Sequence, residues 1–424
     1  MMKKLINTIF FICILAVTVL SSCNNSKNND EPNVKNEPPA QYSITLSAPQ
    51  QKVLNQSNDF AFDVLKAINS EDGNVFVSPY SLGQALGMLA NGAEGKTYDE
   101  IAAVLKIGDG TSLDDINSYY ATMNSALTSI KCSSQFAVAN SLWVNKDYSV
   151  FDDYKEGMKI HYGAKVENVD FSDSKTFDLI NSWGNTQTGG HIPSIVNVKE
   201  ELDPVAMLLN CLFFKGLWSY FLKENTRDDY FRNHTYHNES MKLMHSESAT
   251  LNGWASDEEL AVELDYGGKA FQFMVMMPTR MNINDYIKAF DGAKYQDLLS
   301  KMKKASSVVE MPKFKCSFDN KLNTTLKKLG IVGVFDEFAQ LDKIAKVSYT
   351  EKVRVSNVLQ KASIEVNEEG SVATVVTRSD VDVNTAPGIS GIYVIKRPFI
   401  YLIKERTTGA ILFVGKVQSM AGMQ

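Results

Sequence analysis

One run of residues limits the folds open to this chain more than any other. Positions 205–214 read Val-Ala-Met-Leu-Leu-Asn-Cys-Leu-Phe-Phe, so Asn210 is the one polar residue among ten. A strand with one solvent-exposed face alternates apolar and polar residues, so this run predicts a strand buried on both faces of its sheet. The Asn210 amide must then find partners inside the protein, because leaving it unpaired would cost about 1–3 kcal/mol.

Helices and further strands are predicted on both sides of this run, which indicates a mixed α/β (α+β) protein. Ser78 followed by Pro79 is a strong helix start, and the first turn of that helix brings Ser78 and Ser81 together. No linker rich in Pro, Gly or Ser divides residues 45–424, so they are predicted to form one domain. Helices are predicted at Val53–Ile68, 78–90, Ser112–Ile130, Ser174–Thr188, Ile283–Met302 and Asn320–Leu329, and the other strands at Asn74–Val77, Phe136–Val144, Leu260–Tyr266, Phe271–Met277, Val353–Val366, Phe399–Lys404 and Ile411–Val417.

The N-terminus is predicted to be a signal peptide over residues 1–22. Lys3 and Lys4 form a short basic region, and the apolar run Ile9–Leu20 has 12 residues, too few to cross a bilayer. The next residues, Leu20-Ser21-Ser22-Cys23, resemble a bacterial lipobox. The resemblance implies cleavage before Cys23, a lipid on its sulfur, and export to a bacterial cell envelope, with the outer membrane or the cell surface as the expected place. The alternative is an ordinary signal peptide followed by an unrelated cysteine.

Residues 23–44 are predicted to be a flexible tether, since 24–39 are rich in Asn, Lys, Glu and Pro and nearly lack apolar side chains. Loss of two lysines with the signal peptide would move the formal charge from −6 to −8, and an acidic chain without a Lys/Arg block is a poor candidate for binding nucleic acid. The domain's cysteines, Cys132, Cys211 and Cys316, are odd in number and irregularly spaced, which argues against a disulfide framework or a zinc site.

The sequence contains no arrangement of residues typical of an enzyme. It lacks a GxSxG elbow, a GxGxxG motif after a strand and a P-loop. His234 and His237 lie three residues apart in a polar stretch without an HExxH motif or a third ligand, so we interpret them as surface histidines rather than metal ligands. We therefore expect no catalysis, no cofactor and no bound metal.

The segment that follows the predicted strand Val353–Val366 is unusual for a compact domain. Residues 370–397 show no helical period over 28 residues, and long structureless segments in compact domains are usually functional. One parity of 371–384 carries only small or β-branched uncharged side chains, among them Ser371, Ala373 and Val375, whereas the other parity carries every charge. This pattern is typical of a strand with one buried face, so the segment is predicted to be a loop that can become a strand.

At this segment the sequence resembles the serpins. The run Lys361-Ala362-Ser363-Ile364-Glu365-Val366-Asn367-Glu368-Glu369-Gly370 is similar to the family's hinge, and 371–376 is similar to its small-residue proximal loop. Other motifs that resemble the family occur in family order across about residues 45–420. They are 74–81, Asn181-Ser182-Trp183 with Thr188-Gly189-Gly190, 210–218, Met311-Pro312-Lys313-Phe314, Arg397-Pro398-Phe399 and 413–417.

The resemblance implies one domain with a large central β-sheet that can open, two further sheets, eight or nine helices and an exposed reactive loop at about 370–397. It also implies a monomeric suicide inhibitor, whose loop is cut by a serine endopeptidase, or by a papain-like cysteine endopeptidase, and inserts into the central sheet while the enzyme is still acylated. The 14 residues from Ser371 to Asn384 would span about 46 Å, close to the roughly 50 Å diameter of a compact domain of this size. The alternative is a serpin-fold binding protein that does not inhibit.

The resemblance also assigns roles to single residues. The expected hinge residues are Glu368, Gly370, Ser371, Ala373 and Val375. Lys313 is expected to form an ion pair with Glu368, and Trp218 to lie where the hinge first inserts. The polar network under the opening sheet is expected to contain Ser78, Ser81, Asn210 and Gln360, with the glutamine in place of the histidine that the family often has. The stretch Trp218–Thr226 is one residue shorter than the family's usual spacing, so its local geometry is expected to differ.

In serpins the cut usually falls about fourteen residues after the hinge glycine, so the resemblance implies a scissile bond at Asn384-Thr385, within the window Val383–Ala386. The small or β-branched side chains of this window suit elastase-like or subtilisin-like endopeptidases. Arg378 would suit trypsin, but a cut there leaves only about 26 Å of strand for insertion.

Activation by heparin is not expected. The predicted helix Ser112–Ile130 matches the helix that binds glycosaminoglycan in some serpins, but here it begins with Asp114 and Asp115 and is followed by a single basic residue, Lys131. The expected partners are target endopeptidases and, through Cys23, a lipid membrane.

Overall fold

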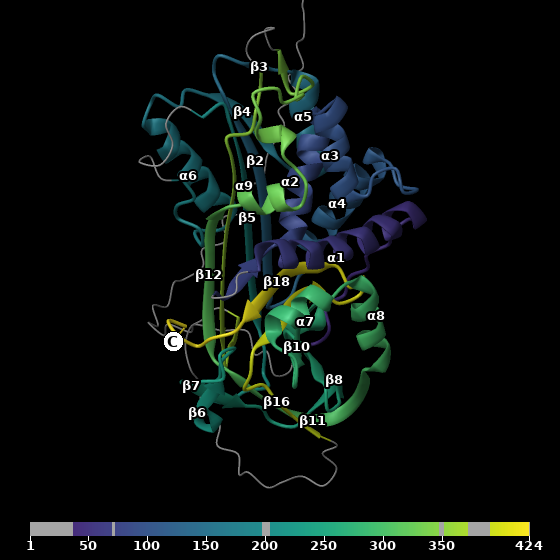
Figure 1. Ribbon diagram of the computed structural model, residues 1–424, viewed down its shortest axis with the longest axis vertical. Coiled ribbons are helices and arrows are strands. Elements are labelled where there is room, and N and C mark those ends of the chain that lie inside the picture. Colours follow the sequence, from purple (N-terminus) through teal and green to yellow (C-terminus); the bar gives the residue numbers. More distant parts are fainter. Residues whose placement is uncertain (1–36, 70–72, 197–203, 347–351, 372–390, 424) are drawn as a thin grey trace, which may run out of the picture. The chain divides into compact units, whose positions relative to one another are not determined.

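The protein has a mixed α/β fold with three sheets, as the sequence predicted (Figure 1). The structure, a computed structural model, describes residues 37–69, 73–196, 204–346, 352–371 and 391–423. Within these ranges lie nine α-helices: α1 (Ala48–Ile68), α2 (Pro79–Gly92), α3 (Gly95–Leu105), α4 (Leu113–Ser129), α5 (Asp152–Tyr162), α6 (Lys175–Gln187), α7 (Ile283–Ala289), α8 (Gly292–Lys301) and α9 (Asn323–Lys328).

A six-stranded sheet is covered by helices on both faces. Its strands, in spatial order, are β12 (Phe314–Lys321), β14 (Asn357–Asn367), β15 (Gly370–Ser371), β5 (Ala206–Leu217), β2 (Gln135–Asn145) and β4 (Lys165–Val169). The apolar run of the sequence forms β5, with α2 against one face of the sheet and α6 against the other (Figure 1). Because helices cover both faces of the sheet, the run has apolar residues at successive positions instead of alternating apolar and polar ones. This is the sheet that is expected to open.

The second large sheet has ten strands. Their order is β1 (Val75–Val77), β18 (Ile411–Val417), β17 (Phe399–Glu405), β10 (Phe271–Pro278), β9 (Glu259–Asp265), β8 (Ala249–Ala255), β11 (Lys303–Pro312), β7 (Asn238–His245) and β6 (Arg227–Arg232), and β16 (Gly391–Val394) pairs with β11. Two short strands, β3 (Ser149–Val150) and β13 (Ala345–Lys346), form the third sheet. All residues of β17 and β18 are buried, so this C-terminal hairpin lies in the core.

Several predicted elements have different bounds in the structure; α1 begins at Ala48 rather than Val53, and β5 continues to Leu217 rather than ending at Phe214. The helix predicted over Ile283–Met302 is two helices, because Asp291 caps α8 by accepting a hydrogen bond from the backbone N–H of Lys294 at 2.8 Å. The helix predicted from Asn320 begins only at Asn323, since β12 continues to Lys321, and the strand predicted from Val353 begins at Asn357. The prediction also missed α3 and α5, whose sequences are less apolar than that of α2.

The residues before α1 contact the rest of the domain. The Glu37 carboxylate accepts hydrogen bonds from the backbone N–H and the hydroxyl of Ser133 at 2.7 and 2.5 Å. The Tyr42 hydroxyl donates to the buried Glu405 carboxylate at 2.5 Å. Residues 37–44, which the sequence predicts as part of the tether, are therefore held against the domain. None of the helices in the described ranges is long and apolar enough to span a bilayer.

Candidate functional site

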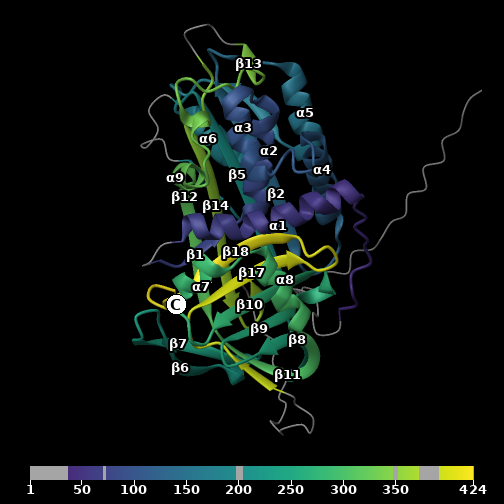
Figure 2. The ribbon, with the colours of Figure 1, turned by 45° about the vertical axis from the view of Figure 1, so that its right-hand side comes forward.

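Two neighbouring parallel strands of the six-stranded sheet, β5 and β14, are labelled in Figure 2, and their pairing shows that they part from each other along their length. β5 and β14 are paired from Met207 opposite Asn357 to Cys211 opposite Lys361. Toward their other ends β15 lies between them, antiparallel to both, with Ser371 opposite Val366 of β14 and opposite Gly216 of β5. Between these two pairings, no residue in the described ranges pairs with the facing edges of 212–215 and 362–365. Directly beyond the hinge, the inner edges of the sheet thus have no partner strand among the described residues.

The expected reactive bond lies outside the described residues. This holds for Asn384 and Thr385, for Val383 and Ala386 on either side, and for the hinge residues Ala373 and Val375. The chain is described again from Gly391, where β16 pairs in parallel with β11. Of the expected hinge, the structure therefore describes Glu368, Gly370 and the backbone of Ser371.

Gly370 occupies a position that admits no side chain. Its φ is 142°, a backbone conformation that residues with a Cβ rarely adopt. A Cβ built there would lie 2.0 Å from the carbonyl oxygen of Gly216 and 2.6 Å from the Cα of Leu217, both in the β5 backbone. The hinge can therefore approach β5 this closely only because residue 370 is glycine.

Trp218 contacts the turn between β14 and β15. Its backbone N–H donates to the carbonyl of Glu369 at 3.0 Å, and its indole Nε1 donates to the carbonyl of Asn367 at 2.9 Å. The buried indole stacks on Tyr266, with ring centroids 5.3 Å apart and planes 2° from parallel. Tyr266 in turn packs against Gly216, where a Cβ would come within 2.4 Å of the ring. Trp218 is thus fixed beneath the place where the inserted strand would begin.

Glu368 forms the base of the hinge. Its carboxylate lies 2.8 Å from the Nζ of Lys313 and accepts a hydrogen bond from the Thr226 hydroxyl at 2.7 Å, and the residue is 5 % exposed. Burial alone would raise the pKa of this carboxyl, but the bonds from Lys313 and Thr226 outweigh it and hold the pKa below its usual value. Glu368 is therefore charged at neutral pH and holds two other segments together.

Ser78 joins the start of α2 to β14. Its backbone N–H donates to the side-chain oxygen of Gln360 at 2.8 Å, and its carbonyl accepts from the Gln360 amide nitrogen at 3.0 Å. The Ser78 hydroxyl caps the helix by accepting from the N–H of Ser81 at 3.1 Å, and it donates to the carbonyl of Leu412 at 2.8 Å. Both donor and acceptor of the glutamine amide are used, which an imidazole could do only in one tautomer.

Asn210 belongs to a neighbouring set of buried amides. Its Nδ2 donates to the Oδ1 of Asn140, its cross-strand partner in β2, at 2.6 Å. Asn140 donates to the side-chain oxygen of Gln84 in α2 at 2.9 Å. Asn210 also lies beside Gln360 in register, but the described hydrogen bonds include none between these two side chains. Ser78, Ser81 and Gln360 are thus brought together, whereas Asn210 bonds to the neighbouring strand β2, on the side of β5 away from β14.

Sequence reasoning missed three residues of this site, namely Thr226, Asn140 and Gln84. Asn140 and Gln84 each interrupt an apolar element, as Asn210 does, so the same signal of a polar residue in a buried run could have found them. Thr226 carries no such signal, because it lies in a polar stretch and meets Glu368 only in the folded chain.

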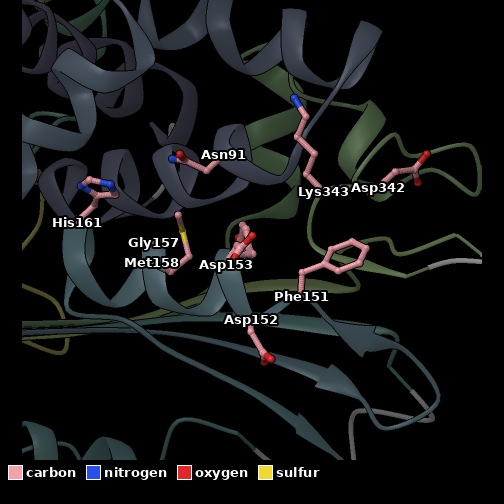
Figure 3. A pocket seen from close by; sticks show the side chains of 10 residues that line it. Asn91, Phe151, Asp152, Asp153, Gly157, Met158, His161, Asp342 and Lys343 are labelled. Carbon is pink, nitrogen blue, oxygen red and sulfur yellow. The ribbon is translucent and has the colours of Figure 1, made fainter.

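The structure also has a surface cavity elsewhere in the domain (Figure 3). It has a volume of 660 Å³ and lies at the opposite end of α2 from Ser78, with lining residues that include Asn91, Asp152 and His161. In Figure 3 the titratable side chains around it are spread apart rather than directed at one point. The described residues also contain no cluster of three or more His, Cys, Asp or Glu that could hold a metal ion. Burial raises the pKa of Cys211 to about 12 and that of Cys316 to about 11, so these thiols are poor nucleophiles.

Comparison with known proteins finds related sequences and structures over most of the chain. Iripin-2 of Ixodes ricinus is 29% identical over 378 residues, which cover 88% of this chain and 94% of that protein. Leukocyte elastase inhibitor of Equus caballus is 27% identical, over 87% of this chain and 100% of the relative. The crystal structure of tengpin, a thermophilic serpin in its native state, superposes with a TM-score of 0.79 at 28% identity, over 90% of this chain and 97% of tengpin.

The family itself follows from a match to a family model described as "Serpin (serine protease inhibitor)", which extends over residues 55–420. This range includes α2 with Ser78, both strands that part, the hinge and the buried C-terminal hairpin. The resemblance found in the sequence is thereby confirmed, and the chain belongs to the serpin family of protease inhibitors.

Proposed function

We propose that this serpin is a suicide inhibitor of serine endopeptidases that acts by inserting its cleaved loop between β5 and β14. The observation that carries the proposal is the parting of these strands, with Gly370–Ser371 already between them. Because β15 is antiparallel to both neighbours, each further residue of an inserted strand would pair with an edge that no residue of the described ranges pairs with. The relatives named as elastase inhibitors support an endopeptidase as the target.

The free energy of insertion is large enough for such a mechanism. About a dozen new ladder hydrogen bonds at roughly 0.5–1.5 kcal/mol each amount to about 6–18 kcal/mol, before any burial of side chains. This is comparable to the whole stability of a typical domain, about 5–15 kcal/mol. Insertion could therefore distort an enzyme that is still attached to the loop, and the intact inhibitor must be kinetically trapped.

The two sets of buried amides both end on α2. Gln360 ties β14 to α2 through Ser78, and Asn210 ties β5 to β2 through Asn140, which bonds Gln84 of α2. No described side-chain bond joins β5 directly to β14, so the strands can begin to part with both sets intact. Full opening moves at least one of the strands relative to α2, and one of the two sets must then rearrange.

The target class follows from the expected scissile bond. Within Val383–Ala386 the side chains are small, β-branched or amide-bearing, which suits elastase-like or subtilisin-like serine endopeptidases, with papain-like cysteine endopeptidases as a further class. Trypsin should instead cut after Arg378 and inactivate the protein, because the eight residues from Ser371 to Arg378 are too few for full insertion.

We further propose that Cys23 carries a lipid and holds the inhibitor at a bacterial cell envelope, at the outer membrane or the cell surface. The sequence Leu20-Ser21-Ser22-Cys23 supports this location. An inhibitor placed there would protect the cell from the proteases of a host or a competitor.

The test is incubation of residues 37–424 with elastase, subtilisin, papain and trypsin, followed by denaturing gel electrophoresis and mass spectrometry of the released peptide. A complex that survives boiling in detergent, with release of a peptide that begins within 384–386, is the expected result for elastase or subtilisin. Stable complex with trypsin through Arg378 and with none of the others would overturn the assignment of the target. Cleavage by all four enzymes without any complex would favour the alternative, a serpin-fold binding protein that does not inhibit.

A further inference from the structure

The segment from Trp218 to Thr226 contacts three consecutive residues of the hinge turn. Besides the two bonds from Trp218 and the bond from Thr226 to Glu368, the Nζ of Lys223 lies 2.6 Å from a carboxylate oxygen of Glu369. Asn367, Glu368 and Glu369 are thus all bound by one short piece of chain.

The local geometry of this segment directs two side chains at the two glutamates. Lys223–Asn225 form a single 3₁₀ turn, closed by a hydrogen bond from the N–H of Thr226 to the carbonyl of Lys223 at 3.1 Å. The closing bond brings Thr226, which is extended, close to Lys223, so the two side chains can reach adjacent residues of another segment. They meet Glu369 and Glu368, which are adjacent in the hinge turn.

The segment is anchored independently of the hinge. Phe221 is buried, lies 5.5 Å from the Trp218 ring and forms a β-bridge with Ser246. The N–H of Glu247 donates to the carbonyl of Tyr220 at 2.7 Å. The 3₁₀ turn is therefore a fixed support against which the hinge turn is held, rather than a loop that would follow the hinge when it moves.

The two ion pairs of the hinge differ in their exposure to solvent. Glu368, which pairs with Lys313, has a side chain that is 5 % exposed, whereas the side chains of Lys223 and Glu369 are 47 % and 22 % exposed. Salt screens exposed charges strongly and buried ones weakly. Lys313 is itself 38 % exposed, so both pairs are screened, and the contact between Lys223 and Glu369 is the more sensitive of the two to ionic strength.

We propose that Lys223 is a positioning residue, which holds the hinge turn through Glu369 in register for insertion and makes that hold dependent on ionic strength. The inference deepens the proposed function, since the effect of Lys223 on inhibition rests on loop insertion. The effect of Lys223 on the hinge turn does not depend on insertion, because the contact exists in the uncleaved protein. An exposed ion pair of this kind changes a local equilibrium about two- to fivefold.

Hydrogen exchange of the Glu369–Ser371 amides tests the contact without any protease. In low salt, Lys223→Gln should speed this exchange about two- to fivefold, and the charge exchange Lys223→Glu with Glu369→Lys should restore the slower rate. In about 0.5 M salt the wild type should exchange as fast as the Lys223→Gln variant. Lys242→Gln is the matched control, because Lys242 forms an exposed pair with Asp228 at 2.8 Å that does not touch the hinge. Equal exchange of the wild type and Lys223→Gln in low salt, or no restoration by the charge exchange, would overturn the proposal.

The number of inhibitor molecules consumed per elastase molecule provides the second readout. It should rise for Lys223→Gln in low salt and stay unchanged for Lys242→Gln, since a hinge that is less well placed inserts later and more acyl-enzyme is hydrolysed. If the wild type formed no complex at all, the proposed function would fail while the exchange result still decided the role of Lys223. If exchange changed as expected but the consumption did not, Lys223 would position the hinge without aiding inhibition, and the proposal would be wrong in that part.

Discussion

Replacement of Gly370 by alanine should remove the hinge from its place between β5 and β14. The new Cβ would lie 2.0 Å from the carbonyl oxygen of Gly216 and 2.6 Å from the Cα of Leu217, so it would overlap backbone atoms that cannot rotate away. A φ of 142° adds strain of about 1–3 kcal/mol for a residue with a side chain. Since 1.36 kcal/mol is a factor of ten, the docked hinge should become about 5- to 150-fold less populated from strain alone.

The assay is titration of a fixed amount of elastase with the Gly370→Ala variant. More inhibitor should be consumed per enzyme than for the wild type, because insertion would begin from an undocked hinge. The thermal unfolding midpoint should stay close to that of the wild type, since Gly370 lies in the hinge and not in the core. Gly391→Ala is the control, because a Cβ at Gly391, at the far end of the loop, meets nothing within 4 Å. Equal consumption by wild type and Gly370→Ala, or an equal rise for Gly391→Ala, would refute the reasoning.

Three further outcomes are expected. Ala373→Arg should turn the inhibitor into a substrate, because residue 373 faces the core after insertion and a buried unpaired guanidinium costs several kcal/mol. Thr374→Arg, on the opposite face of the inserted strand, should be milder, and equal inhibition by both variants in the elastase titration would contradict the assignment of the buried face. The pKa of Glu368 is lowered in the folded protein, so the ionised carboxylate contributes its full stabilisation above the unfolded pKa of about 4.3, and this is lost as the pH falls through the lower folded value. The difference in unfolding midpoint between wild type and Glu368→Gln should thus shrink from pH 7 to pH 3, and a difference independent of pH would contradict this role of the carboxylate. Cys23→Ala should abolish labelling by radioactive fatty acid and leave the protein soluble or unprocessed, and labelling that persists would exclude this cysteine as the lipid site.

Much of the fold could be predicted because burial leaves a pattern in the sequence. The unbroken apolar run around Asn210 predicted a strand covered on both faces, and β5 has helices on both sides. Ser78-Pro79 predicted the start of α2, and the capped first turn lies where it was expected. The hydrophobic pattern did not reveal the break between α7 and α8, because that break depends on a single capping residue, Asp291, so the two helices were predicted as one.

The site was predictable only where its residues form motifs. The ion pair between Lys313 and Glu368 could be expected from two separate motifs that resemble serpin sequences, and the structure has the two charged groups 2.8 Å apart. The bonds of Asn210 could not be assigned in advance, because the choice between Asn140 and Gln360 depends on which neighbouring strand lies closer in space. Lys223 and Thr226 were missed for a related reason, since a single 3₁₀ turn leaves no periodic signal.

The unfolding midpoint in guanidinium chloride, measured before and after elastase cuts the loop, tests loop insertion most directly. If residues 371–384 insert between β5 and β14, the added ladder bonds stabilise the cleaved protein by about 6–18 kcal/mol. The midpoint should then move upward by about 1 M or more, since guanidinium slopes for domains are on the order of several kcal/mol per M. Mass spectrometry must confirm that the cut lies within Val383–Ala386. A cleaved protein with the same midpoint as the intact one would contradict insertion and leave this chain a serpin that does not inhibit by this mechanism.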